Sequence, residues 1–269
     1  MPDQHLLDTK QVAQFAADGF LRFDNLVPDE LNRAVCDLYE EGVPRLKGGT
    51  PLSEAWPYSP IGEVFRLPEV QGIYRSLVGP DPLYDHHAIH KVDAGRERGQ
   101  IWHADAIIDT RVHYDIQFFY FAHDTPREMG GTAFLPGSHF RRISESDIAR
   151  YQNFSGQTTM VCEAGTIAVA HHGIWHCAQP NTTDRMRYMF KLRLNPTVKQ
   201  TLLWDTSDID DLDVIKALNA NHGWYGNEVR LEYVNRIKFW RFLTGDDAFD
   251  MSYWLSRLEN MPEEPLAAA

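Results

Sequence analysis

The chain of 269 residues is long enough to bury a large hydrophobic core, and its 43% hydrophobic and 24% charged residues are typical of a soluble globular protein. Acidic residues outnumber basic ones by 38 to 26, which gives a formal net charge of -12 and argues against a nucleic-acid-binding surface. Because the chain has no apolar stretch of 18 residues and no basic start followed by an apolar run, we expect neither a membrane span nor a signal peptide.

The first part of the chain, over about residues 9–80, predicts helices around one short strand. Thr9 is a plausible N-cap of a first helix that ends at Gly19, and the alternating run "FLRFDNL" after it predicts a strand. In "VPDELNRAVCDLYEEG", apolar residues recur at helical spacing between Pro28 in the first turn and Gly42 at the end. A further helix is expected near 68–78.

Residues 43–62 carry four prolines and three glycines, a composition that breaks regular structure. We therefore expect a long loop here. Long loops in compact domains are often lids over a functional site. The aromatic residues Trp56 and Tyr58 favour such a lid, and both are candidates for contact with a substrate.

From Leu83 to about Pro196, short alternating runs are separated by Gly, Pro and Asn, which predicts a β-sandwich or barrel. Helical patterns return after Pro196, notably in "NEVRLEYVNRIKFWRFLTGDD". We therefore expect a mainly β fold with flanking helices in one domain over residues 1–269. Its β-barrel core would span about 83–196, and a helical extension would span about 197–260.

The three cysteines are odd in number, widely spaced and without a Cys-x-x-Cys pair, so they indicate neither a zinc knuckle nor a redox motif. They are Cys36, Cys162 and Cys177. A reducing compartment is the simplest setting for them, and we expect a cytoplasmic protein.

Two copies of a His-x-Asp pattern lie close together, at His103 and Asp105 and again at His113 and Asp115. Residues two apart in a strand point to the same face, so either pair could direct an imidazole and a carboxylate to one metal ion. Taken alone, such a pair is more often a histidine hydrogen-bonded to a nearby carboxylate. The first pair has the small Ala104 between its members, whereas the second opens a strongly aromatic strand, so we interpret the second pair as scaffold.

A further imidazole, His176, lies in "HCAQPN", and Arg187 follows it by eleven residues. Two histidines and one carboxylate fill one face of an octahedral Fe(II) and leave positions open for co-substrates. The planar fork of an arginine suits the distant carboxylate of such a co-substrate. Alternatives for the last histidine and for the arginine remain open: His171, His172, Arg185 and Arg193.

Three segments in this order, "WHADA" (102–106), "GGTAFLPGSH" (130–139) and "HCAQPNTTDRMR" (176–187), resemble the phytanoyl-CoA dioxygenase-like (PhyH) family. With the opening "QVAQFAADGFLRFDNLVPDEL", the resemblance runs from about residue 9 to 196. Members of this family are non-haem Fe(II)- and 2-oxoglutarate-dependent oxygenases built on a double-stranded β-helix, a cupin-like jelly roll. No recognisable motif covers the chain from Thr197 on.

The resemblance implies that His103, Asp105 and His176 are the iron ligands. It implies that Arg187 binds the far carboxylate of 2-oxoglutarate. A hydroxyl residue that often supports this carboxylate is replaced by Ala178. Candidates to take over its role are Thr132, Gln100 and Lys91.

The function expected from the resemblance is hydroxylation of an unactivated C–H bond of a small-molecule metabolite. Fe(II) would be the cofactor, 2-oxoglutarate and O2 the co-substrates, and succinate and CO2 the by-products. Besides Trp56 and Tyr58, we name His139 and Trp224 as candidates for substrate contact. We expect a monomer or homodimer without nucleic-acid or membrane partners. A cupin-like metal-dependent isomerase and a catalytically silent small-molecule-binding protein on the same fold are the alternatives.

Overall fold

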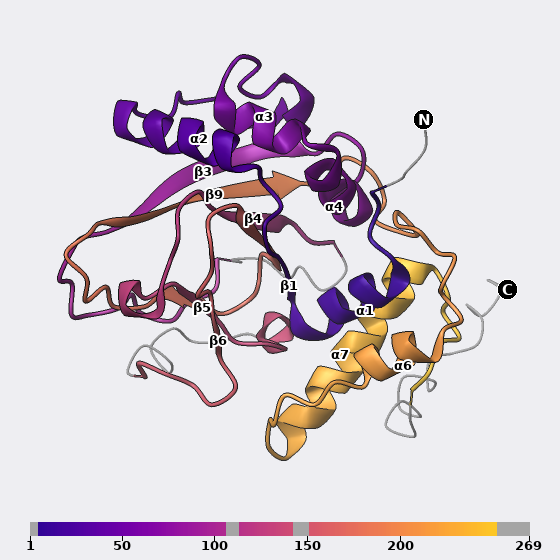
Figure 1. Ribbon diagram of the computed structural model, residues 1–269. Helices are drawn as coiled ribbons and strands as arrows, with labels where there is room; N and C mark the ends of the chain where they lie inside the picture. The colour runs from indigo at the N-terminus through magenta and orange to yellow at the C-terminus, as the bar shows by residue number, and fades with distance from the viewer. Residues whose placement is uncertain (1–4, 106–112, 142–150, 252–269) are drawn as a thin grey trace, which may run out of the picture.

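Two antiparallel β-sheets and a set of flanking helices make up the computed structural model, which describes residues 5–105, 113–141 and 151–251 (Figure 1). The helices are α1 (Thr9–Asp18), α2 (Asp29–Glu41), α3 (Pro60–Arg66), α4 (Pro68–Val78), α6 (Leu212–Leu218) and α7 (Asn227–Thr244). The strands are β1 (Phe20–Phe23), β2 (Thr50–Pro51), β3 (Leu83–Val92), β4 (Ile116–Phe121), β5 (Thr132–Phe134), β6 (Thr158–Thr159), β7 (Thr166–His171), β8 (His176–Ala178) and β9 (Arg187–Asn195). The expectation of a mainly β core between helices is confirmed.

The larger sheet has six strands in the order β1-β7-β4-β9-β3-β2, and the smaller sheet has three in the order β6-β5-β8. Every strand pair in both sheets is antiparallel. Sequence neighbours are rarely sheet neighbours, so most pairings join distant parts of the chain.

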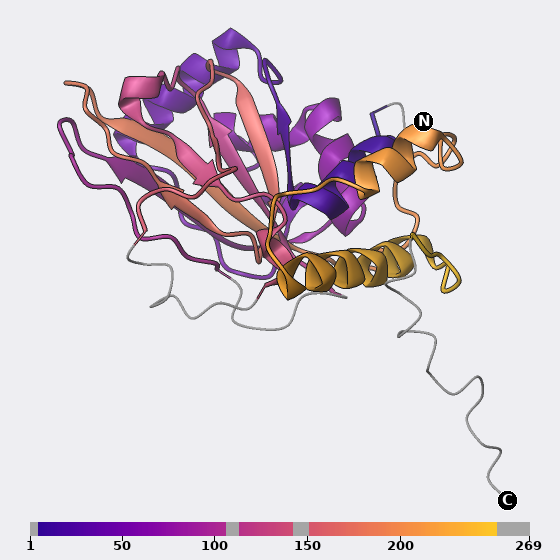
Figure 2. The same cartoon turned by 90° about the horizontal axis from the view of Figure 1, so that it is seen from below.

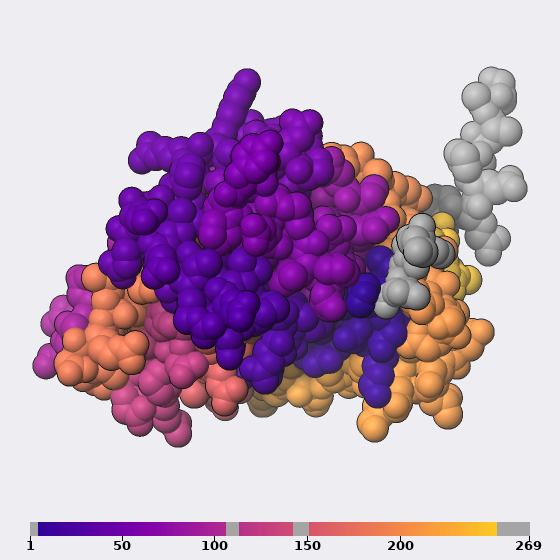
Figure 3. Space-filling view, turned by 45° about the horizontal axis from the view of Figure 1, so that its top comes forward, coloured from indigo at the N-terminus to yellow at the C-terminus, as the bar shows by residue number. Residues whose placement is uncertain are grey.

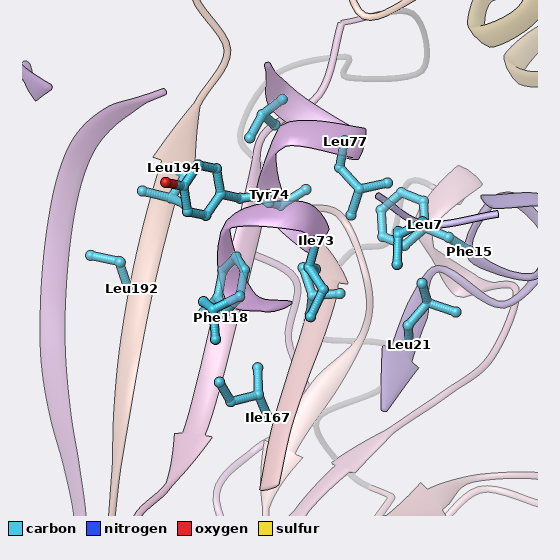
Figure 4. Packing of buried hydrophobic residues seen from close by; sticks show 14 of the residues in the cluster. Leu7, Phe15, Leu21, Ile73, Tyr74, Leu77, Phe118, Ile167, Leu192 and Leu194 are labelled. Atoms are coloured by element: carbon cyan, nitrogen blue, oxygen red, sulfur yellow. The ribbon is translucent and has the colours of Figure 1, made fainter. Parts of the chain in front are cut away.

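The outer face of the larger sheet is covered by the N-terminal helices, which occupy most of the view in Figure 3. Alternate residues of the central strands, among them Phe118, Ile167 and Leu192, point to this face. They pack against Ile73 and other apolar residues of α4, as Figure 4 shows. This layer is the larger part of the hydrophobic core.

The inner face of the larger sheet faces the smaller sheet. Phe119 of β4 and Met189 of β9 belong to a second buried cluster together with Phe134 of β5. β4 and β7 are buried along their whole length, so both faces of these strands are covered. The inner face is where polar side chains of interest gather.

The C-terminal helices pack on α1 and on one end of the larger sheet (Figure 2). Trp204 donates a hydrogen bond of 3.1 Å from Nε1 to Oγ1 of Thr9, and Phe239 of α7 lies edge-on to Tyr114. None of the described helices is both long and apolar enough to cross a membrane.

Two local expectations need correction. Asp8, and not Thr9, is the N-cap of α1, because the Asp8 carboxylate accepts from the Gln11 backbone while the Thr9 hydroxyl is buried against Trp204. Residues 43–62 are not loop throughout, since they contain β2 and the first turn of α3, which begins at Pro60. Proline suits the first turn of a helix as well as a loop, and here it opens the helix.

Candidate metal centre

The two histidines His103 and His176 lie opposite each other on paired backbone. The amide of each donates to the carbonyl of the other, at 3.2 and 2.9 Å, so His103 forms an isolated antiparallel β-bridge with His176 of β8. Directly opposed residues of an antiparallel pair project their side chains to the same side. The two rings consequently face each other, with centroids 4.4 Å apart.

Asp105 completes a three-residue cluster whose possible ligand atoms all lie within 4.8 Å of one another. Nε2 of His103 lies 3.5 Å from Oδ1 of Asp105, and Nε2 of His176 lies 3.5 Å from Oδ2. Ligand atoms that share one metal ion at about 2.1 Å and at right angles are roughly 3 Å apart. A small contraction would therefore bring these three side chains onto one ion.

The tautomers of both rings suit coordination through Nε2. Nδ1 of His103 donates to the carbonyl of Ile101 at 2.9 Å, and Nδ1 of His176 donates to that of Ile174 at 3.1 Å. With the proton on Nδ1, the lone pair of each Nε2 points to the centre of the cluster. Burial, together with the charge of Lys191, holds the pKa of His176 well below its usual range, so this ring is neutral as a ligand must be.

The carboxylate of Asp105 is held by two residues of neighbouring strands. Lys191 of β9 forms an ion pair with its Oδ2, and Nε2 of Gln117 on β4 donates to the same oxygen at 2.7 Å. Burial would raise the pKa of Asp105, but the neighbouring His176 and Lys191 and these two hydrogen bonds outweigh it and lower the pKa. Asp105 is therefore ionised and fixed in orientation.

A small pocket opens beside the cluster on the inner face. Its lining combines apolar residues with a few polar ones: His90, Gln100, Phe119, Thr132, His176, Ala178, Arg187, Met189 and Lys191. Two of these side chains, on Arg187 and Lys191, are basic and lie on the same face of β9.

Arg187 is 3% exposed, and Nη1 donates to the carbonyl of Met129 at 3.3 Å. Burial, with a smaller contribution from Arg96, lowers its pKa to about 10. No carboxylate among the described parts of the chain pairs with this guanidinium. A buried, unpaired arginine in a pocket suits a ligand that brings its own carboxylate.

Of the three residues predicted to assist Arg187, two line the pocket and one does not. Gln100 and Thr132 are lining residues, and Oε1 of Gln100 accepts from the Ala178 backbone at 3.3 Å. Lys91 is exposed on the opposite face of β3, because the register pairs it with Tyr188, whereas His90 pairs with the inner-face residue Met189. His90 takes the place that Lys91 was expected to have.

The structure places both aromatic residues of the expected lid over residues 43–62 away from the pocket. Trp56 is 3% exposed, and its ring packs against Phe190 on the outer face of the larger sheet. Its indole nitrogen donates to the carbonyl of Pro44 at 2.8 Å. Tyr58 is 97% exposed and contributes nothing to the pocket.

The other two candidates for substrate contact also lie outside this pocket. His139 is buried beneath α1, with Nε2 3.3 Å from the carbonyl of Ala16. Trp224 stacks with Arg141 and meets the edge of Trp175. This aromatic group packs on the outer side of the smaller sheet, together with Cys177, which alternates with His176.

The rival residues have other partners. Asp115 forms an ion pair with Arg193, and the ring of His113 packs against Phe242. His171 stacks on Tyr114 on the outer face. Nδ1 of His172 lies 2.5 Å from Nε2 of Gln117, and Gln117 in turn donates to Asp105.

Sequence reasoning missed Lys191 and Gln117. The available signal was strand alternation, since Lys191 follows Arg187 by four residues in "RYMFKLRLN" and must share its face. A lysine on a strand usually lies on a solvent-exposed face, so Lys191 was not expected in the pocket.

Residues 59–189 match the family model described as phytanoyl-CoA dioxygenase (PhyH). This part of the chain is a PhyH domain. The domain contains all three members of the cluster, His103, Asp105 and His176, and it also contains Arg187. Residues 9–58 lie outside the match, so their resemblance to the family stays a prediction.

Solved structures resemble the chain in fold. HygX from Streptomyces hygroscopicus with nickel and 2-oxoglutarate bound is 14% identical at a TM-score of 0.56, over 78% of this chain and 94% of HygX. The same protein with iron bound is 13% identical at a TM-score of 0.55, over 80% and 95%. SnoK, a non-haem alpha-ketoglutarate-dependent carbocyclase from nogalamycin biosynthesis, is 20% identical at a TM-score of 0.52, over 71% and 84%.

These similarities confirm the predicted double-stranded β-helix, with the two facing sheets as its two sides. At this level of identity they establish the fold and nothing finer. None of the curated proteins matches the sequence.

Proposed function

We propose that the PhyH domain is a non-haem Fe(II)- and 2-oxoglutarate-dependent oxygenase that hydroxylates an unactivated C–H bond of a small-molecule metabolite. O2 would be the second co-substrate, and succinate and CO2 would be released. The observation that carries the proposal is the convergence of His103, Asp105 and His176 with both Nε2 atoms unprotonated and directed to the centre of the cluster. The fold shared with HygX, which has been solved with iron and with 2-oxoglutarate, supports it.

Each residue of the cluster has a definite part in this proposal. His103, Asp105 and His176 would hold Fe(II) on one face, which leaves adjacent positions open for ligands. When bound, iron supplies the one-electron and O2 chemistry that no side chain here can perform. The protein's part is to hold the metal and to orient what binds beside it.

The pocket beside the cluster would receive 2-oxoglutarate. Arg187 is buried and unpaired among the described residues, so its planar fork is free to bind the far carboxylate through two parallel hydrogen bonds. Thr132 lies in the same lining and offers a hydroxyl where Ala178 has none. Phe119 and Met189 supply an apolar wall that excludes water from the reacting groups.

The test is anaerobic titration of the purified protein with Fe(II) and then with 2-oxoglutarate. Chelation by 2-oxoglutarate gives iron a weak visible absorption band, which we expect in wild type. We expect it to disappear in His176→Ala, which removes a ligand, and to need at least about tenfold more 2-oxoglutarate in Arg187→Ala, which removes a charge-assisted bidentate contact. His113→Ala, which alters the other His-x-Asp pair, is the matched control and should behave as wild type.

Two results would contradict the proposal. Tight iron binding without any response to 2-oxoglutarate would favour a cupin-like metal enzyme of another reaction class. Absence of iron binding would favour a silent small-molecule-binding protein. Release of succinate in air, with a panel of candidate substrates, then separates productive from unproductive binding.

A further inference from the structure

Lys191 lies at the point where the ligand atoms converge. Its ammonium forms an ion pair with Oδ2 of Asp105, and it lies 3.1 Å from Nε2 of His176. Since Nδ1 of His176 carries the ring proton, the Nε2 lone pair accepts from the ammonium. Lys191 therefore occupies the His176 lone pair that a metal ion would use, and it pairs with one oxygen of the Asp105 carboxylate.

The position of this lysine is enforced by the sheet. Lys191 is in the middle of β9, hydrogen-bonded between β3 and β4, directly opposite Phe119. Its ammonium lies 5.3 Å from the Phe119 ring centroid, and the residue is 7% exposed. A side chain anchored on a central strand can swing about its own bonds but cannot leave the pocket.

We propose that Lys191 is an internal cation that competes with the metal for Asp105 and His176, and that metal loading requires its displacement. This inference rests on the proposed function, because it concerns the same three ligands. A metal ion and an ammonium cannot share one lone pair, and two cations within about 4 Å repel strongly in a pocket of low dielectric. The metal-free protein keeps Asp105 and His176 together by means of Lys191, and every metal ion that enters must break these contacts.

The displaced ammonium needs a new partner. The metal would then take up the charge of Asp105. The other basic side chain among the described pocket residues is Arg187, which cannot serve as a counter-ion. A buried cation without a counter-ion is costly, so an anionic ligand would stabilise the displaced form. Binding of the metal and binding of 2-oxoglutarate are therefore coupled through Lys191, in addition to their coupling by chelation. Each ligand increases the affinity of the protein for the other.

The experiment compares Co(II) binding by the full-length wild type and Lys191→Met, followed by the visible spectrum of the metal, with and without saturating 2-oxoglutarate. We expect Lys191→Met to bind Co(II) at least about tenfold more tightly, within the usual range of coupling energies. The gain from 2-oxoglutarate should be smaller in Lys191→Met than in wild type. Lys91→Met removes the same charge on the exposed face of β3, and its affinity should stay within about twofold of wild type.

Circular dichroism checks that each variant is folded. If Lys191→Met does not fold, Lys191→Gln replaces it in the experiment, because glutamine can keep a hydrogen bond to Asp105 but has no charge. Tighter binding in the variant, including binding by the variant alone, supports competition. Equal or weaker Co(II) binding in the variant overturns the proposed competition, but it does not contradict the proposed metal centre. If neither protein binds Co(II), both this inference and the proposed function are wrong. An equal gain from 2-oxoglutarate in both proteins would overturn the coupling.

Discussion

Gln117 connects two groups of the inner face that do not touch each other directly. Its Nε2 donates to Asp105 at 2.7 Å and lies 2.5 Å from Nδ1 of His172. One amide nitrogen has two protons, so it can donate to both acceptors at once. Burial, the largest influence, lowers the pKa of His172 to about 4, so this ring is neutral and its Nδ1 can accept. Gln117 therefore positions the carboxylate without being a ligand itself.

Replacing Gln117 by Leu should weaken metal binding by roughly tenfold, the lower end of the effect of removing a hydrogen bond to a ligand. The carboxylate of Asp105 would lose one of its two fixed contacts and rotate more freely. Co(II) titration measures this, and Gln14→Leu on the exposed face of α1 is the control. Unchanged affinity in Gln117→Leu would show that Asp105 binds the metal without help from Gln117.

At the scale of residues, the sequence predicts what touches the candidate metal better than what surrounds it. The spacing of His103 and Asp105 fixes their common face because it depends only on strand alternation. Which face of β3 turns inward depends on register, so the spacing of residues alone does not show that His90, and not Lys91, lies on the inner face. Trp56 was misplaced for a related reason, since loop composition does not specify the surface on which a loop lies.

The junction of α1 and α7 is organised around one buried charge cluster. His222 lies between these helices, with Nε2 2.8 Å from Asp18 of α1 and Nδ1 bonded to Glu232 of α7. Glu232 also pairs with Arg236, and the ring of His139 is close enough to contribute a small repulsion. Burial alone would lower the pKa of His222, but the hydrogen bonds to the two carboxylates outweigh it and the pKa is raised.

A raised pKa in the folded state gives a defined dependence on pH. The stabilisation by His222 is fully present below the pKa of about 6.5 in the unfolded chain, and it is lost as pH rises through the folded value. We therefore expect the stability difference between wild type and His222→Gln to shrink between pH 6 and pH 9, as measured by urea unfolding. A constant difference for His222→Gln would contradict the expectation.

At the scale of elements, the sequence predicts the long helices and the β core, and it fails where two signals overlap. Gly19 ends α1 in the left-handed conformation, as expected of a glycine after the last turn. Pro60 is equally suited to a loop or to a first helical turn, and packing of α3 on the core decides between them. The short β2, β6 and β8 have too few residues for any alternation to be visible.

The whole molecule depends on the extension beyond Pro196, where no recognisable motif occurs. Phe239 of α7 is fully buried, and its ring meets Tyr114 at 5.0 Å and Phe140 at 5.6 Å. Helix α7 thus covers the end of the larger sheet next to α1. Its role could not be predicted from the sequence, because the long helical pattern indicates a helix but not the surface that it covers.

Truncation of Phe239 to Ala should lower the free energy of unfolding by about 3 to 5 kcal/mol, the range for a large buried aromatic residue. Urea unfolding measures the loss, and Co(II) binding under native conditions should remain. Tyr225→Ala, at a residue that is 92% exposed, should change stability by less than about 0.5 kcal/mol. A small effect of Phe239→Ala would mean that α7 adds little to the stability of the fold.

The pairing of β1 with β7 places Phe20 opposite Ala170, so an edge of the larger sheet is built from the beginning of the chain and from a strand made much later. During synthesis on the ribosome, the N-terminal helices therefore emerge well before the surface on which they pack. Folding is postponed until β9, which joins β3 to β4, has also been made. Contacts this distant in sequence close slowly, and we expect the nascent chain to rely on chaperones during that interval.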